Sequence, residues 1–179
     1  MQWNVIVTTL PGRPRFLAAL EGLRRLGEFR PTAFRDVCLG RVEDARLFLE
    51  ALLAARAGGE RWALAIARAI PVEQTFSFSP ETLVAQLESA LAPLAARMEA
   101  GSFHLRLERR GLSGTLASDA IEREVADHLF TRAEERGVSL RTSFHDPDYV
   151  LVAETLGTEC GVALLPRALR ERFPFVAAR

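Results

Sequence analysis

The first 70 residues alternate between β-branched runs and segments in which apolar residues recur at helical spacing. The β-branched runs predict strands, which we expect at residues 3–10, 30–40 (one strand or two short ones) and 62–70. The helical spacing predicts helices, which we expect at residues 16–26 and 42–57. Gly27 and Gly58-Gly59 end these helices. The resulting order, β-α-β-(β)-α-β, predicts a ferredoxin-like unit with a split β-α-β arrangement.

Pro71-Val72 marks a boundary, so we expect one domain over residues 1–71 and a second over residues 72–179. In the second domain, strands are expected at residues 103–110, 138–144, 149–156 and 159–165, with residues 73–78 as a strand or a linker. Helices are expected at residues 79–93 and 118–136, and residues 166–179 form a short helix or an extended tail. The pattern as a whole predicts an α+β or α/β protein.

Helix-start signals support the two helices of the second domain. Ser79-Pro80-Glu81 combines an N-cap serine, a proline at the first helical position and an acid in the first turn. Pro93 is expected to kink that helix or end it nearby. Ser118 or Asp119 is expected to cap the next helix, and Asp119 with Glu122 has capping-box spacing.

The composition is that of a folded protein without a membrane segment. Apolar residues make up 49% of the chain and charged residues 26%. No apolar stretch approaches the roughly 18 residues needed to cross a bilayer, and the N-terminus does not read as a signal peptide. We therefore expect no membrane association and a cytoplasmic location. Cys38 and Cys160 are expected to be small buried hydrophobes rather than a disulfide.

The charge is balanced overall but uneven along the chain. The formal net charge is zero, and all 23 basic residues are arginine. No lysine is present to form a Schiff base or to serve a phosphate-binding loop. Residues 1–35 carry six arginines against two glutamates, and residues 163–179 carry four arginines against one. Arginine binds phosphate in a bidentate fork and stacks on bases, so these basic ends are compatible with RNA.

Recognisable catalytic chemistry is sparse. The sequence contains no phosphate-binding loop, no Gly-x-Gly-x-x-Gly and no Gly-x-Ser-x-Gly, and Gly111-Leu112-Ser113-Gly114 is typical of a turn. His145-Asp146-Pro147-Asp148 is the one cluster of ligand-type side chains. We interpret it as a polar turn, in which aspartates bond to backbone amides. The alternative is a small enzyme with a metal or acid–base site around His145, Asp146 and Asp148.

Arginines on or beside strands are the positive signal for function. They are Arg68, Arg106, Arg109, Arg110 and Arg141. Strand alternation points Arg106 away from the core face formed by Phe103, Leu105 and Leu107. Arginines displayed from a sheet suit recognition of an RNA backbone, and the alternative is an ordinary solvated sheet edge. A surface map is a test of these readings, because arginines that share one face favour RNA binding and scattered arginines weaken it.

Several motifs, in order, resemble THUMP-domain proteins over about residues 62–176. Arg68-Ala69-Ile70-Pro71-Val72-Glu73-Gln74-Thr75 is similar to the Arg-x-x-Pro-Val-x-x-Thr step that leads into the THUMP region of adaptors assisting tRNA cytidine N4-acetylation. Asp146-Pro147-Asp148-Tyr149, followed by an apolar strand and Glu154, is similar to a second family motif. Further similarity lies in Cys160-Gly161-Val162 and in Arg170-x-Arg172-Phe173.

The resemblance implies a ferredoxin-like domain followed by a THUMP domain. It implies a non-catalytic adaptor, without a cofactor, that grips tRNA or another structured RNA near the acceptor end. The adaptor would present that RNA to a separate modifying subunit, which is an acetyltransferase if the resemblance to the acetylation adaptors includes their partner. The arginines expected to contact phosphate are Arg68, Arg106, Arg109, Arg110, Arg141 and Arg167. A protein-interaction module of the same fold, without RNA binding, is the alternative.

Overall fold

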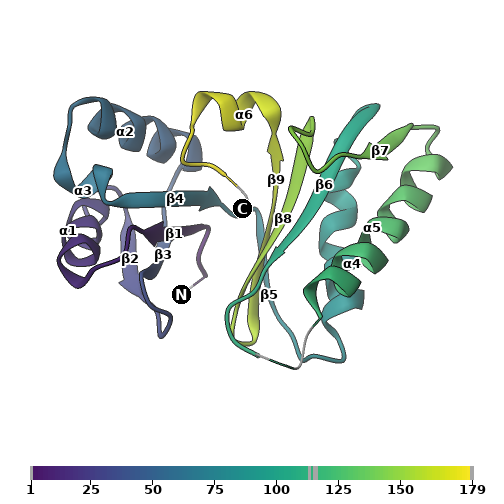
Figure 1. Cartoon of the computed structure of the whole chain (residues 1–179), viewed down its shortest axis with the longest axis horizontal. Coiled ribbons are helices and arrows are strands. Elements are labelled where there is room, and N and C mark those ends of the chain that lie inside the picture. The colour runs from purple at the N-terminus through teal and green to yellow at the C-terminus, as the bar shows by residue number, and fades with distance from the viewer. Residues whose placement is uncertain (1, 113, 115–116, 178–179) are drawn as a thin grey trace. The chain divides into compact units, whose positions relative to one another are not determined.

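The computed structural model describes residues 2–112, 114 and 117–177, which form two compact units. The first unit comprises the described residues through Val72 together with Arg170–Ala177, and the second comprises the described residues of Glu73–Leu169. Each unit contains its own β-sheet (Figure 1), so the chain is a mixed α/β protein with two sheets. Within the described part, no helix is both long enough and apolar enough to cross a membrane. Ser113, part of the predicted turn, lies outside the described residues.

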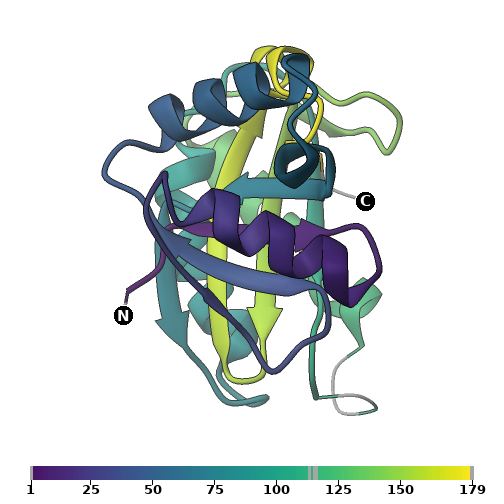
Figure 2. The same ribbon diagram turned by 90° about the vertical axis from the view of Figure 1, so that its left-hand side faces the viewer.

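The first unit has two main helices and a four-stranded antiparallel sheet. Its elements are β1 (Val5–Thr9), α1 (Arg13–Leu23), β2 (Glu28–Pro31), β3 (Val37–Arg41), α2 (Ala45–Ala57), α3 (Arg61–Leu64) and β4 (Ile66–Pro71). The strand order is β2-β3-β1-β4. Figure 2 shows α1, in purple, lying across this sheet. The predicted succession of strands and helices is confirmed, with two strands, β2 and β3, where one or two were expected.

The strand predicted over residues 62–70 is wrong in its first part. Residues Arg61–Leu64 form the short helix α3, and the strand begins at Ile66. Trp62 explains the difference, because its ring packs against Gly22 of α1. A Cβ at Gly22 would lie 2.2 Å from that ring. The indole therefore anchors a helical turn on α1, a tertiary contact that the local pattern does not reveal.

The helix predicted from Val42 begins three residues later, at Ala45. Asp44 is the reason, because its Oδ1 accepts hydrogen bonds from the backbone amides of Arg46 at 2.7 Å and Leu47 at 2.9 Å. These bonds satisfy amides that have no partner inside the helix. Aspartate is among the preferred N-cap residues, so this start follows from the sequence once the cap is recognised.

The second unit is a five-stranded mixed sheet with α4 and α5 packed on one face (Figure 1). Its elements are β5 (Gln74–Ser77), α4 (Leu83–Ala95), β6 (Gly101–Glu108), α5 (Ser118–Glu135), β7 (Leu140–Thr142), β8 (Tyr149–Leu156) and β9 (Glu159–Pro166). Helix α6 (Arg167–Arg172) follows β9. The strand order is β5-β9-β8-β6-β7, in which β6 runs parallel to both β7 and β8. Strand β7 therefore forms one edge of the sheet.

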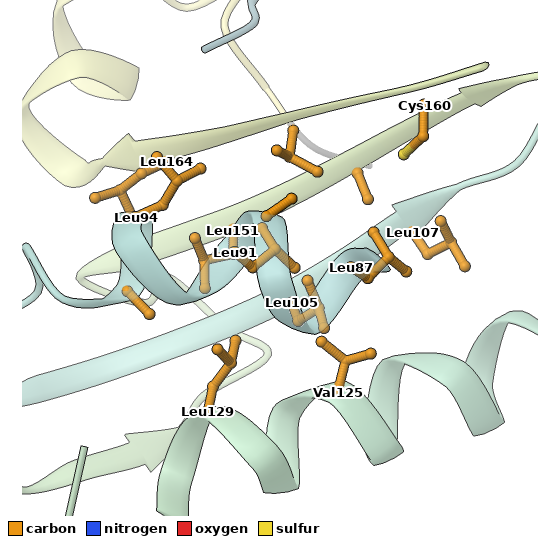
Figure 3. Packing of buried hydrophobic residues seen from close by; sticks show 14 of the residues in the cluster. Leu87, Leu91, Leu94, Leu105, Leu107, Val125, Leu129, Leu151, Cys160 and Leu164 are labelled. Carbon is orange, nitrogen blue, oxygen red and sulfur yellow. The ribbon is translucent and has the colours of Figure 1, made fainter. Parts of the chain in front are cut away.

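Alternate residues of β6 build the core of this unit. Phe103, Leu105 and Leu107 are buried among apolar side chains of α4 and α5, as the alternation predicted. Figure 3 shows Leu105 and Leu107 facing the helices that carry Leu87 and Val125. The intervening positions of β6 belong to the other face of the sheet. The core thereby fixes the orientation of Arg106.

The caps predicted for the two helices of this unit are not used as expected, although α5 begins at Ser118 as predicted. Helix α4 begins at Leu83, because Ser79 opens a turn in which its backbone amide donates to Thr82 Oγ1 at 2.9 Å. Helix α5 has Ala117 at its N-cap position without a side-chain hydrogen bond there. Glu122, the expected partner of a capping box, instead accepts the Leu107 amide through Oε1 at 2.6 Å. The helix α4 does end close to Pro93, at Ala95, as predicted.

Both cysteines are buried and free, as expected for small hydrophobes. Burial raises the pKa of the Cys38 thiol to about 12, and it also raises the pKa of Cys160. A thiol with so high a pKa is protonated at neutral pH and is a weak nucleophile.

Candidate nucleic-acid interface

The edge strand β7 covers only the first part of β6. It pairs with Gly101, Ser102 and Phe103, whereas β6 continues to Glu108. Beyond Phe103, β6 has no strand on this side, and its open edge faces α5. Here the carboxylate of Glu122 accepts the Leu107 amide, as a strand carbonyl would otherwise do. The sheet therefore ends in a side-chain-lined groove rather than in a further strand.

This groove has a volume of about 410 Å³ and lies among β6, α5 and the segment after β7. Its lining combines aromatic, cationic and acidic side chains, including His104, Arg106, Asp119, Arg123, Asp127 and Phe144. We call it the β6–α5 groove. Phe144 is 80% exposed, and its ring meets that of His104 edge-on, with centroids 5.1 Å apart at 90°. An exposed ring held in one orientation can stack on a planar ligand.

Arg106 brings a cation and an unsatisfied donor to the groove. Its Nη1 lies 3.8 Å from Glu122 Oε1, and its side chain is 37% exposed. Its Nε is buried and has no hydrogen-bond partner among the described residues. A buried donor without an acceptor is costly. The exposed part of the guanidinium is what a ligand in the groove can contact. Of the six predicted phosphate contacts, Arg106 is the one that lines this groove.

His104 is a neutral ring at neutral pH. Partial burial lowers its pKa from the ordinary value, and the charge of Glu122 only partly opposes that effect. A neutral imidazole offers one N–H donor and one lone-pair acceptor. His104 therefore contributes polarity and ring contact to the groove without adding positive charge.

Arg141 and Arg109 flank the same part of the sheet. Arg141 is exposed on the edge strand β7, where it pairs with Ser102 and immediately precedes Thr142 of the groove. Arg109 follows β6 and is partly buried, and its Nη1 lies 3.5 Å from the carbonyl oxygen of Leu112. At that distance the hydrogen bond is weak. Arg141 is the more accessible of the two.

Arg110 is held inside the second unit. Its side chain is 13% exposed and forms a hydrogen-bonded ion pair with Glu154, whose side chain is 1% exposed. A second carboxylate, Glu108, lies 3.9 Å from Arg110 Nη2. The expectation that Arg110 contacts phosphate does not fit this arrangement, because its charge already neutralises a buried acid. Glu154 lies on the motif that resembles the THUMP family.

Arg68 belongs to the first unit and is buried, with 4% of the residue exposed. Its Nε donates to the carbonyl oxygen of Ala177 at 2.6 Å, which ties β4 to the end of the chain. The expectation that Arg68 contacts phosphate therefore does not fit its burial. Arg68 and Arg110 therefore serve internal contacts within their own units, which weakens the case for phosphate binding by all five arginines.

Arg167 holds the turn that contains the Asp-Pro-Asp sequence. Its guanidinium donates to the side chain and carbonyl of Asp146, and also to Asp148 Oδ1 at 3.1 Å. The other oxygen of Asp148 accepts both the amide of Ser102, at 2.8 Å, and its hydroxyl, at 2.7 Å. This is the polar turn anticipated from the sequence. Across residues 2–112, 114 and 117–177, no group of three His, Cys, Asp or Glu side chains gathers as a metal site.

The hydrogen bonds to Ser102 give the first prediction. They lower the pKa of Asp148 to about 2, with the amide contributing most and Arg167 adding to the shift. Because the pKa of the folded state is depressed, the stabilisation by this carboxylate is present above its unfolded value and is lost as the pH falls through about 2. In Ser102→Ala, which removes the hydroxyl donor, we expect the pKa of Asp148 to rise measurably in an NMR carboxyl titration. An unchanged titration would contradict the assigned contact.

The structure brings together some predicted residues and adds others. Arg106 and Arg141 lie at the open edge of the second sheet. Arg167, at the start of α6, bonds to the turn at Asp146 and Asp148, and Arg68 belongs to the other unit. Phe144 was missed by the sequence reasoning. The predicted strand over residues 138–144 included it, whereas β7 ends at Thr142. Its signal in the sequence was an aromatic residue between the polar residues Ser143 and His145.

Comparison with known proteins identifies the architecture. The sequence matches no protein-family model and no curated protein. Among solved structures, PH1313 from Pyrococcus horikoshii superposes on 92% of the chain with a TM-score of 0.62 and 12% identity. TrmN from Thermus thermophilus superposes on 97% with a TM-score of 0.61 and 20% identity. This chain shares their fold. A 4-thiouridine synthetase, solved as an RNA complex with bound ATP, superposes on 92% with a TM-score of 0.58 and 15% identity.

The shared fold corresponds to about half of each of those proteins. The matched region covers 54% of PH1313, 48% of TrmN and 41% of the 4-thiouridine synthetase. At 12–20% identity the likeness is one of fold. Function has to be argued from the site itself.

Proposed function

We propose that the protein binds tRNA through the open edge of its second sheet and presents it to a separate RNA-modifying subunit. The observation that carries this proposal is the β6–α5 groove, whose lining combines an exposed Phe144 with the partly exposed guanidinium of Arg106. Arg141 adds an exposed cation on the neighbouring edge strand. Support also comes from the fold shared with a 4-thiouridine synthetase that was solved with RNA.

The charges of the groove suggest which part of an RNA binds inside it and which part binds outside it. Asp119 and Asp127 line the groove, so a phosphate placed deep inside would meet like charge. Base amino groups, in contrast, donate hydrogen bonds to carboxylates. We therefore propose that an unpaired base stacks on Phe144, while the RNA backbone lies along β7 against Arg141.

We infer that the first unit is a ferredoxin-like domain and the second a THUMP domain. The first inference rests on the β-α-β-β-α-β succession and on the strand order β2-β3-β1-β4. The second rests on the motifs shared with THUMP proteins, two of which have clear structural roles here. Asp148 anchors the turn before β8, and Glu154 pairs with Arg110.

The adaptor role, without catalysis by this chain, is supported by the motifs that the sequence lacks and by the bonds that its aspartates make. The sequence offers no lysine and none of the nucleotide-binding or nucleophile motifs sought above. The two aspartates of the only ligand-type cluster are bonded to Arg167. The catalytic groups would then come from another subunit in the cytoplasm, an acetyltransferase if the resemblance to acetylation adaptors holds.

A second candidate is suggested by the lengths of the similar proteins. The fold of this chain occupies 41% of the 4-thiouridine synthetase, so the same fold occurs within a larger enzyme. In that case the chain would act as the RNA-binding part of an enzyme rather than as a separate adaptor. Affinity purification of the full chain from its own cells separates the two, because an adaptor requires a distinct RNA-modifying enzyme among its stoichiometric partners.

The test of RNA binding is a titration at two salt concentrations with three RNAs. They are bulk tRNA, an acceptor-stem minihelix with a single-stranded 3′ end, and a blunt duplex of equal length. We expect tighter binding to the first two, weakened by salt, because phosphate contacts release counterions. Absence of binding to all three at low salt would refute the proposal and favour a protein-interaction module.

Arg141→Ala gives a prediction specific to the backbone contact. Removal of one phosphate contact is expected to weaken binding of every RNA by a similar factor and to reduce the slope of log affinity against log salt by about 1. Arg132→Ala is the matched control, since that exposed arginine lies on α5 outside the lining of the groove. Equal slopes of log affinity against log salt for Arg141→Ala and the wild type would show that Arg141 does not contact the RNA backbone.

A further inference from the structure

A second hollow lies in the first unit, between α1 and the loop that joins β2 to β3. Its volume is also about 410 Å³. The apolar part of its lining includes Phe16 and Leu17 from α1 and Phe34 from the loop. Leu17 is 51% exposed, and both phenylalanines are partly exposed. We call this feature the α1–loop hollow.

The loop side of the hollow is well ordered by its own hydrogen bonds. The hydroxyl of Thr32 accepts the amide of Phe34 at 3.0 Å and lies 3.0 Å from the carbonyl oxygen of Val37, to which it can donate. The carbonyl of Asp36, a residue with a positive φ of 60°, accepts the amide of Thr9 at 2.9 Å. A surface held in place before binding loses little entropy when a ligand arrives.

The rim of the hollow is cationic. Arg13 is exposed and has no hydrogen-bond or ion-pair partner among the described residues. The side chain of Arg35 is 87% exposed, and its Nε lies 3.6 Å from Asp36, beyond direct hydrogen bonding. The carboxylate of Asp36, which also lines the hollow, pairs with Arg35 and offsets part of its charge, but both guanidinium groups are exposed and can bind a phosphate. An apolar floor beside two available arginines suits a planar group that carries a phosphate.

The alternative occupant of such a site is a peptide strand added to the edge of the sheet. Strand β2 is that edge, but it has only four residues and ends at Pro31, which has no amide to donate. It also carries Glu28 and Arg30. Short, charged, proline-ended edges disfavour strand addition. The features therefore favour a nucleotide over a peptide.

We propose that the α1–loop hollow binds one unpaired nucleotide of the RNA, with its base against Phe34 and Phe16 and its phosphate on Arg13 and Arg35. This inference rests on the proposed RNA binding and adds a second contact, in the first unit, to the one at the β6–α5 groove. The base stacks against the phenylalanine rings, and the arginines neutralise the adjacent backbone.

The experiment compares the tRNA minihelix, which has an unpaired 3′ end, with the blunt duplex, using the full chain. Phe34→Ala is expected to weaken minihelix binding about tenfold, the size typical of one lost base stack, and to leave duplex binding unchanged. Arg35→Gln, at an exposed position, is expected to weaken minihelix binding severalfold. Leu47→Ala is the control, because Leu47 is a 69% exposed apolar residue of the same unit outside the hollow.

The possible failures are distinguishable. If the wild-type chain binds no RNA, the proposed function fails and this inference fails with it. If Phe144→Ala weakens binding while Phe34→Ala and Arg35→Gln bind like the wild type, the hollow alone is excluded. Thermal unfolding of each variant separates lost binding from lost folding, and Arg35→Gln still tests the hollow if Phe34→Ala unfolds.

Discussion

Replacing Arg110 by leucine is expected to lower the free energy of unfolding by about 3–5 kcal/mol. The substitution leaves the carboxylate of Glu154 buried without its cation, and removing one partner of a buried ion pair has a cost of that size. The side chains of Arg110 and Glu154 are only 13% and 1% exposed, so water cannot replace the lost contact. Chemical denaturation of the variant and the wild type measures the effect.

The contrasting variant is Arg132→Ala, which breaks the surface pair between Arg132 and Glu135. Their side chains are 59% and 57% exposed, so we expect a change of no more than about 0.5 kcal/mol. Adding Glu154→Leu to Arg110→Leu is expected to recover much of the lost stability, because both charges are then gone. Equal stability of Arg110→Leu and Arg132→Ala would show that Arg110 does not neutralise Glu154.

Replacing Phe144 by alanine is expected to weaken binding of tRNA by about tenfold or more, without loss of stability. The ring is 80% exposed, so it contributes little to the core, whereas a base stacked on an aromatic ring contributes about 1–3 kcal/mol to binding. The effect should be larger for RNAs with unpaired nucleotides than for a blunt duplex. Fluorescence anisotropy with labelled RNA measures both affinities.

The same change at another exposed apolar side chain tests whether the effect is specific. Leu47→Ala removes a 69% exposed leucine from α2 and is expected to bind RNA like the wild type. If Phe144→Ala retains full affinity for the minihelix, the base-stacking role of the β6–α5 groove is wrong. If both variants lose affinity equally, the loss does not identify a stacking site.

Much of the fold could be predicted because the apolar spacing records which residues are buried. The alternation of Phe103, Leu105 and Leu107 correctly assigned the core face of β6, and the apolar residues at helical spacing in α4 and α5 form their buried faces. The predictions failed where a contact between residues far apart in the sequence determines the local structure. The helical turn at Trp62 depends on Gly22, and Glu122 bonds to β6 rather than to its own helix terminus.

The candidate site was less predictable, because exposure and pairing depend on the assembled structure. A strand pattern gives the face of an arginine but not its partner, so the sequence did not separate Arg110, paired with Glu154, from Arg141, which is exposed. It also gave no sign that β7 stops at Thr142 and leaves a groove beside β6. A polar turn around Asp148 was predictable from its Asp-Pro-Asp sequence. Its partner was not, because the amide that Asp148 accepts belongs to Ser102 of β6, 46 residues away.

The most direct test of the central claim is photo-cross-linking of the full chain to a minihelix that carries 4-thiouridine at its unpaired positions. Mass spectrometry then identifies the attached peptides. The account predicts cross-links within residues 104–106 or 141–144, at the β6–α5 groove, and their loss in competition with unlabelled tRNA. RNA that binds with salt-dependent affinity but cross-links to neither segment would contradict it.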